Sequence, residues 1–353
     1  MVYLKWLLLP FSVLYGLILR CRHHLYDRGW FGFEQKTIDL PLIVVGNLEV
    51  GGTGKTPMIE YLIRLLRGQY RLATLSRGYG RKSRGYLEVN ANHSVQISGD
   101  EPLQFKKKFP DITVAVSEKR VPAVEKLRPD HDVILLDDAF QHRALKPGLG
   151  ILLFSYDRVL KNPWLLPVGP YRDVFEARKR ADLIVVTKCP DHLSDPHTLA
   201  VQQRLQVKTK NIPIYFTRIA YGTLCSLWKD TTPIPQWETH HVLLVTGIAR
   251  PQPLLEYVQK QAQDVRHLAF PDHHSFTSTD IQQMTSEFAR LSGEFKFILT
   301  TEKDAMRIQS LPAPILDTLR DLPMYYLPIE QQFLDVKQRE NFNKQILAYI
   351  QGV

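Results

Sequence analysis

Residues 40–57 read Leu40-Pro-Leu-Ile-Val-Val-Gly-Asn-Leu-Glu-Val-Gly-Gly-Thr-Gly-Lys-Thr-Pro57, and this stretch decides the fold. Its first half is a short apolar run between positions 42 and 45, typical of a buried strand in a parallel sheet. A glycine-rich turn follows, and apolar residues then recur with the period of a helix from position 58 onward. A strand, a glycine-rich loop and a helix in this order are the context in which a P-loop binds phosphate.

The glycine-rich turn is predicted to bind the phosphates of a nucleotide. Glycines let backbone N–H groups close on phosphate oxygens, and the N-terminus of the next helix adds a favourable dipole. We expect Lys55 to reach the β- and γ-phosphates and the Thr56 hydroxyl to bind Mg²⁺. Glu49 stands where the strict pattern has its first glycine, and a turn without a ligand is the alternative. The predicted nucleotide-binding residues are Val50, Gly51, Gly52, Thr53, Gly54, Lys55, Thr56 and Pro57.

Composition and charge limit the classes of protein to which the chain can belong. With 353 residues, 44% of them apolar, two domains with a sizeable core are expected. The formal net charge of +9 favours an anionic partner such as a nucleotide, a phospholipid or a phosphorylated substrate. Nucleic acid is not expected, because the basic residues are spread out and form no nucleic-acid-binding motif. Cys21, Cys189 and Cys225 form no paired motif, so a reducing cytosolic compartment is expected and a zinc site is not.

The N-terminal stretch, residues 1–30, is predicted to form an apolar helix with a basic flank. No charged residue occurs between Trp6 and Leu19, and a basic cluster follows from Arg20 to Arg28. The uncharged run is shorter than the roughly 20 residues of a spanning helix, and no small-residue cleavage site marks a signal peptide. A helix at the bilayer surface is favoured, with a buried core helix as the alternative. The basic flank would keep the protein on the cytoplasmic side.

Strands and helices alternate along the rest of the chain in two sets. In residues 31–213 this alternation predicts a doubly wound parallel α/β sheet, as in P-loop NTPases. Residues 214–240 resemble a hairpin around Tyr221-Gly222, followed by Pro233 and Pro235, and are interpreted as an inter-domain linker. Residues 241–353 predict a second, smaller α/β domain. Strands are expected at 42–45, 72–76, 113–116, 133–136, 150–154, 183–187, 241–246, 265–270, 296–301 and 324–327, and helices at 58–67, 101–109, 117–128, 252–262, 279–292 and 338–350.

The apolar strand at 133–136 ends in the paired carboxylates Asp137 and Asp138. In a P-loop protein this is the Walker B position, where an aspartate holds Mg²⁺ directly or through water. The alternative is a strand end capped by acidic residues. Because a Gly-Lys-Thr turn lies upstream, we predict Thr56, Asp137 and Asp138 as the Mg²⁺ site. His142 follows five residues after Asp137 and is a candidate to lie near the phosphates.

Three further polar runs stand at the ends of expected elements. Residues 76–81 combine glycines with two arginines, which suits either an anion-binding loop or an ordinary basic turn. Asp100 and Glu101 lie at an expected helix start, where a helix cap is the alternative to a functional role. Asp272 and His273 follow an expected strand and are candidate acid–base groups.

Two runs resemble the guanine-reading Asn-Lys-x-Asp motif of GTPases. In residues 185–190 and 299–304, however, Thr187 and Glu302 replace the asparagine, and Pro190 and Ala305 occupy the aspartate position. ATP is therefore predicted rather than GTP.

In their order along nearly the whole chain, these motifs resemble those of one family, the tetraacyldisaccharide 4'-kinases (lipid A 4'-kinases) of Gram-negative envelope synthesis. That family also lacks the first glycine of the strict P-loop. Two departures are visible: Ala139 stands where glycine is usual, and Asp173 where glutamate is usual. The matching segments are Gly46-Asn47, Val50–Pro57, Ser76–Arg81, Gly99–Pro102, Leu136–Leu145, Leu166–Asp173, Val186–Lys188, Phe270–Phe276 and Thr301–Asp304.

The resemblance implies a reaction and roles for the site residues. The γ-phosphoryl group of ATP would pass to the 4'-hydroxyl of a tetraacylated glucosamine disaccharide 1-phosphate, giving the 1,4'-bisphosphate, at the cytoplasmic face of the inner membrane. Asp100 would accept the proton with help from His273, after the two domains close over substrate. Lys55, Asp137 and Asp138 would neutralise charge on the phosphates. Further candidates for contact with substrate are Arg77, Arg120, His142, Arg172, Asp173 and Asp272.

Two other functions remain open from the sequence. One is a membrane-associated P-loop ATPase that switches partners; such proteins often carry a second lysine just before the paired glycines, where this chain has Val50. The other is a soluble small-molecule kinase with a buried N-terminal helix. An obligate protein partner is not expected for the lipid kinase.

Overall fold

The larger of two sheets in the computed structural model contains the P-loop strand at its centre. The structure describes residues 2–228 and 237–352, and within them nine strands follow the order β14-β8-β7-β6-β1-β5-β2-β4-β3. All neighbouring pairs from β8 to β4 are parallel, whereas the edge strands β14 and β3 are antiparallel. The strands are β1 (Leu42–Asn47), β2 (Leu72–Ser76), β3 (Leu87–Glu88), β4 (Thr113–Val116), β5 (Val133–Asp137), β6 (Leu149–Ser155), β7 (Leu183–Thr187), β8 (Ile214–Tyr221) and β14 (Ile329–Phe333).

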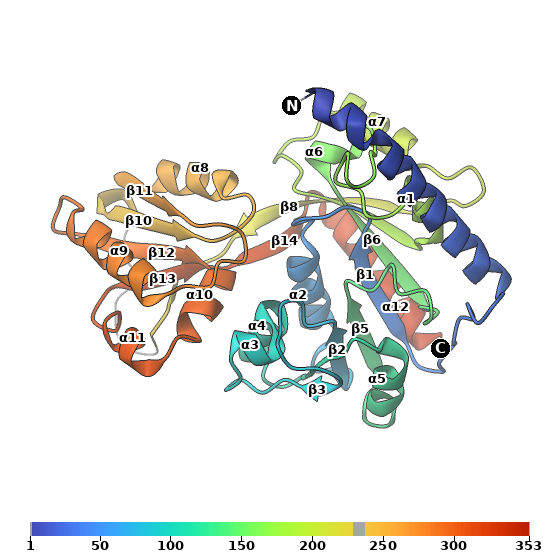
Figure 1. Ribbon diagram of the computed structural model, residues 1–353, viewed down its shortest axis with the longest axis horizontal. Helices are drawn as coiled ribbons and strands as arrows, with labels where there is room; N and C mark the ends of the chain where they lie inside the picture. Colours follow the sequence, from blue (N-terminus) through green and yellow to red (C-terminus); the bar gives the residue numbers. More distant parts are fainter. Residues whose placement is uncertain (1, 229–236, 353) are drawn as a thin grey trace.

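Helices cover both faces of this sheet, as expected of a doubly wound fold (Figure 1). One apolar core joins the sheet to α1 (Val2–Arg28), α5 (Arg120–Leu127) and α7 (Asp195–Leu205). The core on the other face contains residues of α2 (Lys55–Leu66), α4 (Asp100–Lys108) and α12 (Val336–Gln351). The inner strands are buried along their whole length, because both faces are covered.

The second lobe is built on a smaller sheet with the order β11-β10-β12-β13-β9 among the described residues. Its core strands are parallel, and only β9 pairs antiparallel. The elements are β9 (Cys225–Ser226), β10 (His241–Thr246), α8 (Gln252–Gln261), β11 (Asp264–Ala269), α9 (Ser278–Ala289), β12 (Lys296–Thr301), α10 (Glu302–Gln309), α11 (Ala313–Asp317) and β13 (Met324–Leu327). Helix α8 covers one face, and α9 and α10 cover the other.

Two parts of the predicted domain division are wrong. The expected hairpin does not form: β8 pairs with β7 and β14 of the large sheet, whereas β9 belongs to the small one. Pro233 and Pro235 of the predicted linker lie outside the described residues. After the second lobe the chain returns through β14 to the large sheet, and α12 packs on the first lobe with Phe342, Ile346 and Ile350 in its core. The period of residues 338–350 indicates an apolar helix face, but it does not say which sheet that face covers.

Helix α1 lies along the outside of the first lobe with one face turned to the protein (Figure 1). Ser12, Gly16 and Leu19 form its buried side, and the Ser12 hydroxyl donates to the Leu165 carbonyl at 2.9 Å. Among the described residues, no helix combines the length and the apolar character needed to cross a bilayer. Large apolar side chains nevertheless stay exposed on the other side of α1: Leu7, Phe11, Val13, Leu14, Leu17 and Ile18.

Candidate active site

The glycine-rich turn leads from β1 into α2 in the way the sequence predicts. Gly51 and Gly54 have φ angles of 96° and 85°, which residues with a Cβ rarely adopt. Gly54 is the N-cap, so α2 begins at Lys55 and presents its free N–H groups to the loop. Thr53 is held from two sides: its hydroxyl accepts from Asn47 Nδ2 at 2.6 Å, and its carbonyl accepts from the Thr187 hydroxyl at 2.8 Å.

Glu49, the departure from the strict P-loop pattern, has a structural role. Its side chain is buried, and its carboxylate accepts hydrogen bonds from the backbone N–H of Ser155 at 3.1 Å and from Arg158 at 2.9 Å. The position that carries glycine in the strict pattern therefore fastens the loop to the end of β6.

The paired aspartates leave the sheet directly beside the P-loop. Strand β5 neighbours β1 with Asp137 opposite Val45, so both carboxylates emerge next to the glycine-rich turn. Lys55 Nζ lies 3.8 Å from Asp138 Oδ1, and Arg172 donates to both oxygens of Asp138. Burial opposes ionisation of Asp138, but Lys55 and Arg172 outweigh it and lower the pKa of that carboxyl.

Asp137 is in the opposite electrostatic situation. Burial, and then the nearby carboxylates of Glu101 and Asp138, raise its pKa to about 8. Its Oδ1 atom is buried and has no hydrogen-bond partner among the described residues. Asp137 Oδ1 is therefore an available oxygen ligand in a negatively charged environment. Such a position suits a divalent cation such as Mg²⁺, which binds to one or two protein carboxylates and to the phosphates of the substrate. No group of three His, Cys, Asp or Glu side chains within residues 2–228 and 237–352 could hold a metal by itself.

The structure brings Asp100 and His273 together from the two lobes. Asp100 is the first residue of α4, and His273 lies in the turn after β11 with a φ of 58°. His273 Nδ1 is 3.3 Å from Asp100 Oδ2. Burial would raise the pKa of Asp100, but His273, Lys303 and Arg307 outweigh it, so the carboxyl has a pKa well below its usual range. Asp272 stays half exposed beside the ring, with Oδ1 3.9 Å from His273 Nε2.

Glu101 connects this pair to the P-loop. The Thr56 hydroxyl donates to Glu101 Oε1 at 2.7 Å, and Lys303 Nζ of α10 lies 2.5 Å from the same oxygen. The helix start at Asp100 and Glu101 is thus more than a cap: Asp100 Oδ1 accepts from the N–H of Glu101 at 3.0 Å, and both carboxylates also pair with cations of the second lobe.

Three of the candidate substrate residues, Arg77, Arg120 and His142, form a region of positive potential beside Asp137 and Asp138. Burial, and then Arg120, Arg22 and Arg77, lower the pKa of His142 to about 4. Arg120 is buried, and burial lowers its pKa to about 10. The Nε2 atom of His142 is buried and has no hydrogen-bond partner in the part of the chain that the structure describes. Several cations that converge on one neutral imidazole form a suitable environment for an anionic group.

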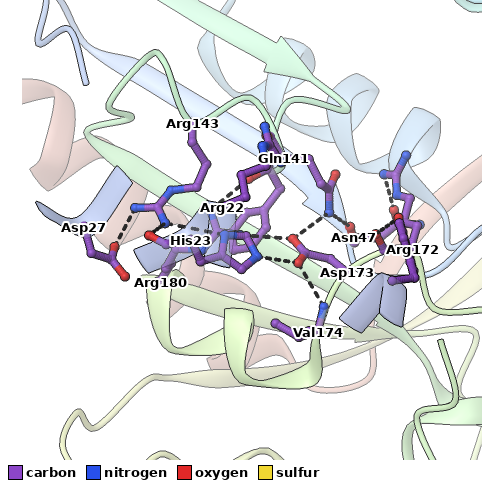
Figure 2. A network of polar contacts seen from close by, with 12 residues as sticks. Arg22, His23, Asp27, Asn47, Gln141, Arg143, Arg172, Asp173, Val174 and Arg180 are labelled. Atoms are coloured by element: carbon purple, nitrogen blue, oxygen red, sulfur yellow. Dashed lines mark hydrogen bonds and ion pairs between the residues drawn. The ribbon is translucent and has the colours of Figure 1, made fainter. Parts of the chain in front are cut away.

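Asp173 does not face this region, which corrects the prediction that it contacts substrate. Its side chain is fully buried and sits in a polar network with the C-terminal part of α1 (Figure 2). His23 Nε2 lies 2.6 Å from Oδ1, and Arg180 donates to Oδ2 at 3.2 Å. The neighbouring Arg172, in contrast, points to Asp138 and donates to Asn47 Oδ1 at 2.5 Å. The Asp173 carboxylate therefore connects α1 to the segment that carries Arg172.

Comparison with known proteins decides the family. A sequence profile described as tetraacyldisaccharide-1-P 4'-kinase matches residues 4–351. The chain belongs to the tetraacyldisaccharide 4'-kinase family. Relatives with this name include those of Bacteroides thetaiotaomicron (41% identical, covering 98% of this chain and 93% of the relative) and Phocaeicola vulgatus (42%; 98% and 95%). LpxK from Aquifex aeolicus, whose crystal structure is a complex with ATP, superposes with a TM-score of 0.74 at 28% identity, covering 98% of this chain and 99% of that one.

Membership of the tetraacyldisaccharide 4'-kinase family confirms two predictions, the P-loop-like α/β fold and the enzyme class of a kinase in lipid A biosynthesis. The sequence did not identify Arg307, which contacts both Asp100 and His273. It also did not single out Lys303: the Thr-Glu-Lys-Asp run was compared with a guanine-reading motif and matched to the family, but no role was assigned to its lysine. The signal available was a lysine and an arginine four residues apart at the start of an amphipathic helix.

Proposed function

We propose that this 4'-kinase transfers the γ-phosphoryl group of ATP to the 4'-hydroxyl of a tetraacylated glucosamine disaccharide 1-phosphate, giving the 1,4'-bisphosphate. The observation that supports it best is the contact between Thr56 of the P-loop and Glu101, the residue next to Asp100. Through it, the phosphate-binding turn and a candidate base are fixed relative to each other. Phosphoryl transfer requires this arrangement, because it depends mainly on positioning and charge neutralisation.

On the nucleotide side, residues 51–56 bind the phosphates of ATP through backbone N–H groups and the N-terminus of α2. The other two predicted residues do not offer an N–H, because that of Val50 donates to the Pro170 carbonyl at 2.7 Å and Pro57 has none. Lys55 supplies a positive charge beside the transferred group, and Arg172 holds Asp138 in place. The contacts of Thr53 with Asn47 and Thr187 keep the turn in one conformation, so that little reorganisation is needed during the reaction.

Thr56, Asp137 and Asp138 are the residues that would hold Mg²⁺. The unpartnered Oδ1 of Asp137 and the negative charge around it fit an oxygen-preferring cation. Once bound, Mg²⁺ would neutralise charge on the β- and γ-phosphates. Arg172 and Lys55 already compensate Asp138, so Asp137 is the more available carboxylate of the pair.

On the acceptor side, the Asp100–His273 pair takes the proton of the 4'-hydroxyl. A sugar hydroxyl is a weak nucleophile, and a base within hydrogen-bond reach increases its reactivity as the P–O bond forms. Arg77, Arg120 and His142 are candidates to bind an anionic part of the substrate, and Asp272 to contact its sugar.

The lipid substrate implies work at a membrane surface. We infer that the exposed apolar side of α1 rests in the head-group region and that the basic cluster from Arg20 to Arg28 contacts anionic lipids. The protein would then be peripheral or monotopic at the cytoplasmic face of the inner membrane, where both ATP and the lipid are available.

The decisive experiment incubates the purified protein with γ-labelled ATP and tetraacyldisaccharide 1-phosphate in mixed micelles and then locates the new phosphate on the product. Label at the 4'-position is expected. Steady ATP hydrolysis that does not depend on the lipid, with no labelled product, would instead indicate a nucleotide switch.

A further inference from the structure

One face of α10 presents two cations to two consecutive carboxylates of the other lobe. Lys303 and Arg307 are four residues apart and so lie on the same side of the helix. Lys303 contacts Glu101 at 2.5 Å, and Arg307 Nη2 donates to Asp100 Oδ2 at 2.6 Å. Helices α10 and α4 pack against each other at this point (Figure 1). The ion pair between Arg307 and Asp100 therefore joins the lobes inside the candidate active site.

Contacts within the second lobe fix the Arg307 side chain in the position from which it donates to Asp100. Its side chain is 6% exposed, and its Nη1 atom donates to Asp304 Oδ1 at 2.8 Å and to the Gly247 carbonyl at 2.9 Å. The backbone N–H of His273 donates to the same Gly247 carbonyl at 3.1 Å. Asp304 in turn accepts from the N–H of Gly247 at 2.9 Å. Arg307 and the turn that carries His273 thus share one rigid support in the second lobe.

The guanidinium and the imidazole approach the same carboxylate oxygen. Arg307 Nη2 lies 3.1 Å from His273 Nδ1 and 2.6 Å from Asp100 Oδ2. Arginine can only donate hydrogen bonds and stays protonated. Its contact with Asp100 is strongest when the carboxyl is ionised. The hydrogen bond between His273 Nδ1 and Asp100 raises the pKa of His273, and the positive charge of Arg307 opposes that rise. Both effects of Arg307 favour the state in which the pair can still accept a proton.

We propose that Arg307 is a positioning residue that holds the Asp100–His273 pair in its proton-accepting form. The inference rests on the proposed role of Asp100 as proton acceptor. In the reaction, the O–H bond of the sugar breaks and its proton passes to the pair. The sugar oxygen forms the new bond to the γ-phosphorus, while the bond from that phosphorus to the bridging oxygen breaks and ADP leaves with the electron pair. Arg307 neither accepts nor loses a proton; it keeps Asp100 ionised and aimed at the ring until that step.

The charges around Asp100 set the expected pH dependence. Arg307 and Lys303 of α10 and His273 of the second lobe favour the carboxylate, and Glu101 on its own helix opposes it. Asp304 lies behind Arg307, and Asp272 lies beside the ring. Removing the charge of Arg307 raises the pKa of Asp100, so protonation would inactivate the enzyme at a higher pH. The acidic limb of the kcat profile is expected to move upward.

The test measures kcat, KM for ATP and pH profiles for the full chain and for Arg307→Ala, Arg307→Gln and Arg307→Lys. The Ala and Gln variants are expected to lose about 10-fold or more in kcat, with KM for ATP changed less than about 2-fold and the acidic limb displaced upward. Arg307→Lys keeps the charge but cannot form the forked contact, so its limb should stay near that of the wild type while kcat falls. Arg290→Ala, which removes an exposed arginine in an i,i+3 pair with Glu287, is the matched control.

The Gln and Lys variants keep the test valid if the Ala variant does not fold. Identical acidic limbs for Gln, Lys and wild-type proteins would overturn the proposal, as would kcat losses that only follow thermal stability. Asp100→Asn separates the two levels of inference. A normal kcat in Asp100→Asn would exclude Asp100 as the proton acceptor. An inactive Asp100→Asn together with a normal Arg307→Gln would exclude only the positioning role of Arg307.

Discussion

His273 Nδ1 lies 3.3 Å from Oδ2 of Asp100, although the two side chains come from different lobes of the molecule. If the two act as one proton-accepting unit, Asp100→Ala should lower kcat by about 10²–10⁴-fold with little effect on KM for ATP. His273→Ala should do the same to a smaller degree. The double variant should be much less impaired than the product of the two single losses, because the second substitution removes a partner already inactive.

Kinetics and thermal unfolding of the same three proteins distinguish this unit from its alternatives. Multiplicative losses would mean that the two residues act independently. A loss of stability with normal kcat per folded molecule would mean that Asp100 only joins the lobes through Arg307 and is not part of the chemistry.

Lys55 and Thr56 are both expected to matter for turnover, and Thr56 also for stability. Both side chains lie at the start of α2, and neither is part of the apolar core. Lys55→Ala or Thr56→Ala should therefore reduce kcat by about 10²-fold or more, the loss typical of one preorganised electrostatic donor. The melting temperature should be unchanged in Lys55→Ala and lower in Thr56→Ala, because the latter removes the hydroxyl that donates to Glu101. Lys260→Ala, at an exposed position of α8, is the control. Near-normal turnover of Lys55→Ala would exclude the P-loop role.

The sequence predicts the bounds of several strands in both sheets, because strand, turn and helix signals are local. β2, β4, β7, β10, β12 and β13 begin and end at the predicted residues. Residues that depend on contacts between distant segments were harder to predict. Glu101, Lys303 and Arg307 acquire their roles only when α10 packs on α4, and no periodicity in either helix contains that information. The same reason explains why α12 was assigned to the wrong lobe: its apolar face could cover either sheet, and the sequence does not show which one it packs against.

His142 should make the protein more sensitive to acid than a neutral side chain would. Its pKa is about 4 in the folded protein, mainly because of burial, and about 6.5 when unfolded. A group with a lowered pKa stabilises the fold fully above its unfolded pKa, and this contribution is lost as the pH falls from about 6.5 to about 4. His142→Gln should flatten the decline in unfolding free energy across that window, measured in urea. The exposed His197→Gln is the control, and parallel curves for His142→Gln and wild type would contradict the prediction.

Asp173 is expected to stabilise the attachment of α1. Asp173→Asn leaves Arg180 and His23 without their carboxylate, and breaking a buried pair of this kind costs about 3 kcal/mol. Asp173→Glu adds a methylene to a side chain that is already fully buried and should cost roughly 1–3 kcal/mol. Glu125→Gln, which removes an exposed pair with Lys36, should cost less than about 1 kcal/mol. Denaturant unfolding measures all three, and a fully stable Asp173→Asn would mean that the network does not hold α1.

The two sides of α1 should separate membrane binding from folding. Leu7, Phe11, Leu14 and Ile18 are between 56% and 70% exposed and recur at helical spacing, so they form one apolar stripe. Replacing all four with serine should lower the partition coefficient onto anionic vesicles, measured by sedimentation, by more than about 100-fold. The reason is that moving each large apolar side chain out of water is favourable by roughly 1.5 kcal/mol or more. Thermal stability and ATP binding should change little, since none of the four lies in the core.

Leu19→Ala on the buried side of α1 is the matched control. It should cost about 2 kcal/mol of unfolding free energy or more, because it opens a cavity, while vesicle binding is retained. Repeating the sedimentation with neutral vesicles tests the basic cluster, since its attraction to anionic lipids is electrostatic and weakens with added salt. If the four-serine protein binds vesicles as the wild type does, the stripe is not the membrane contact, and the lipid substrate must be reached through another surface.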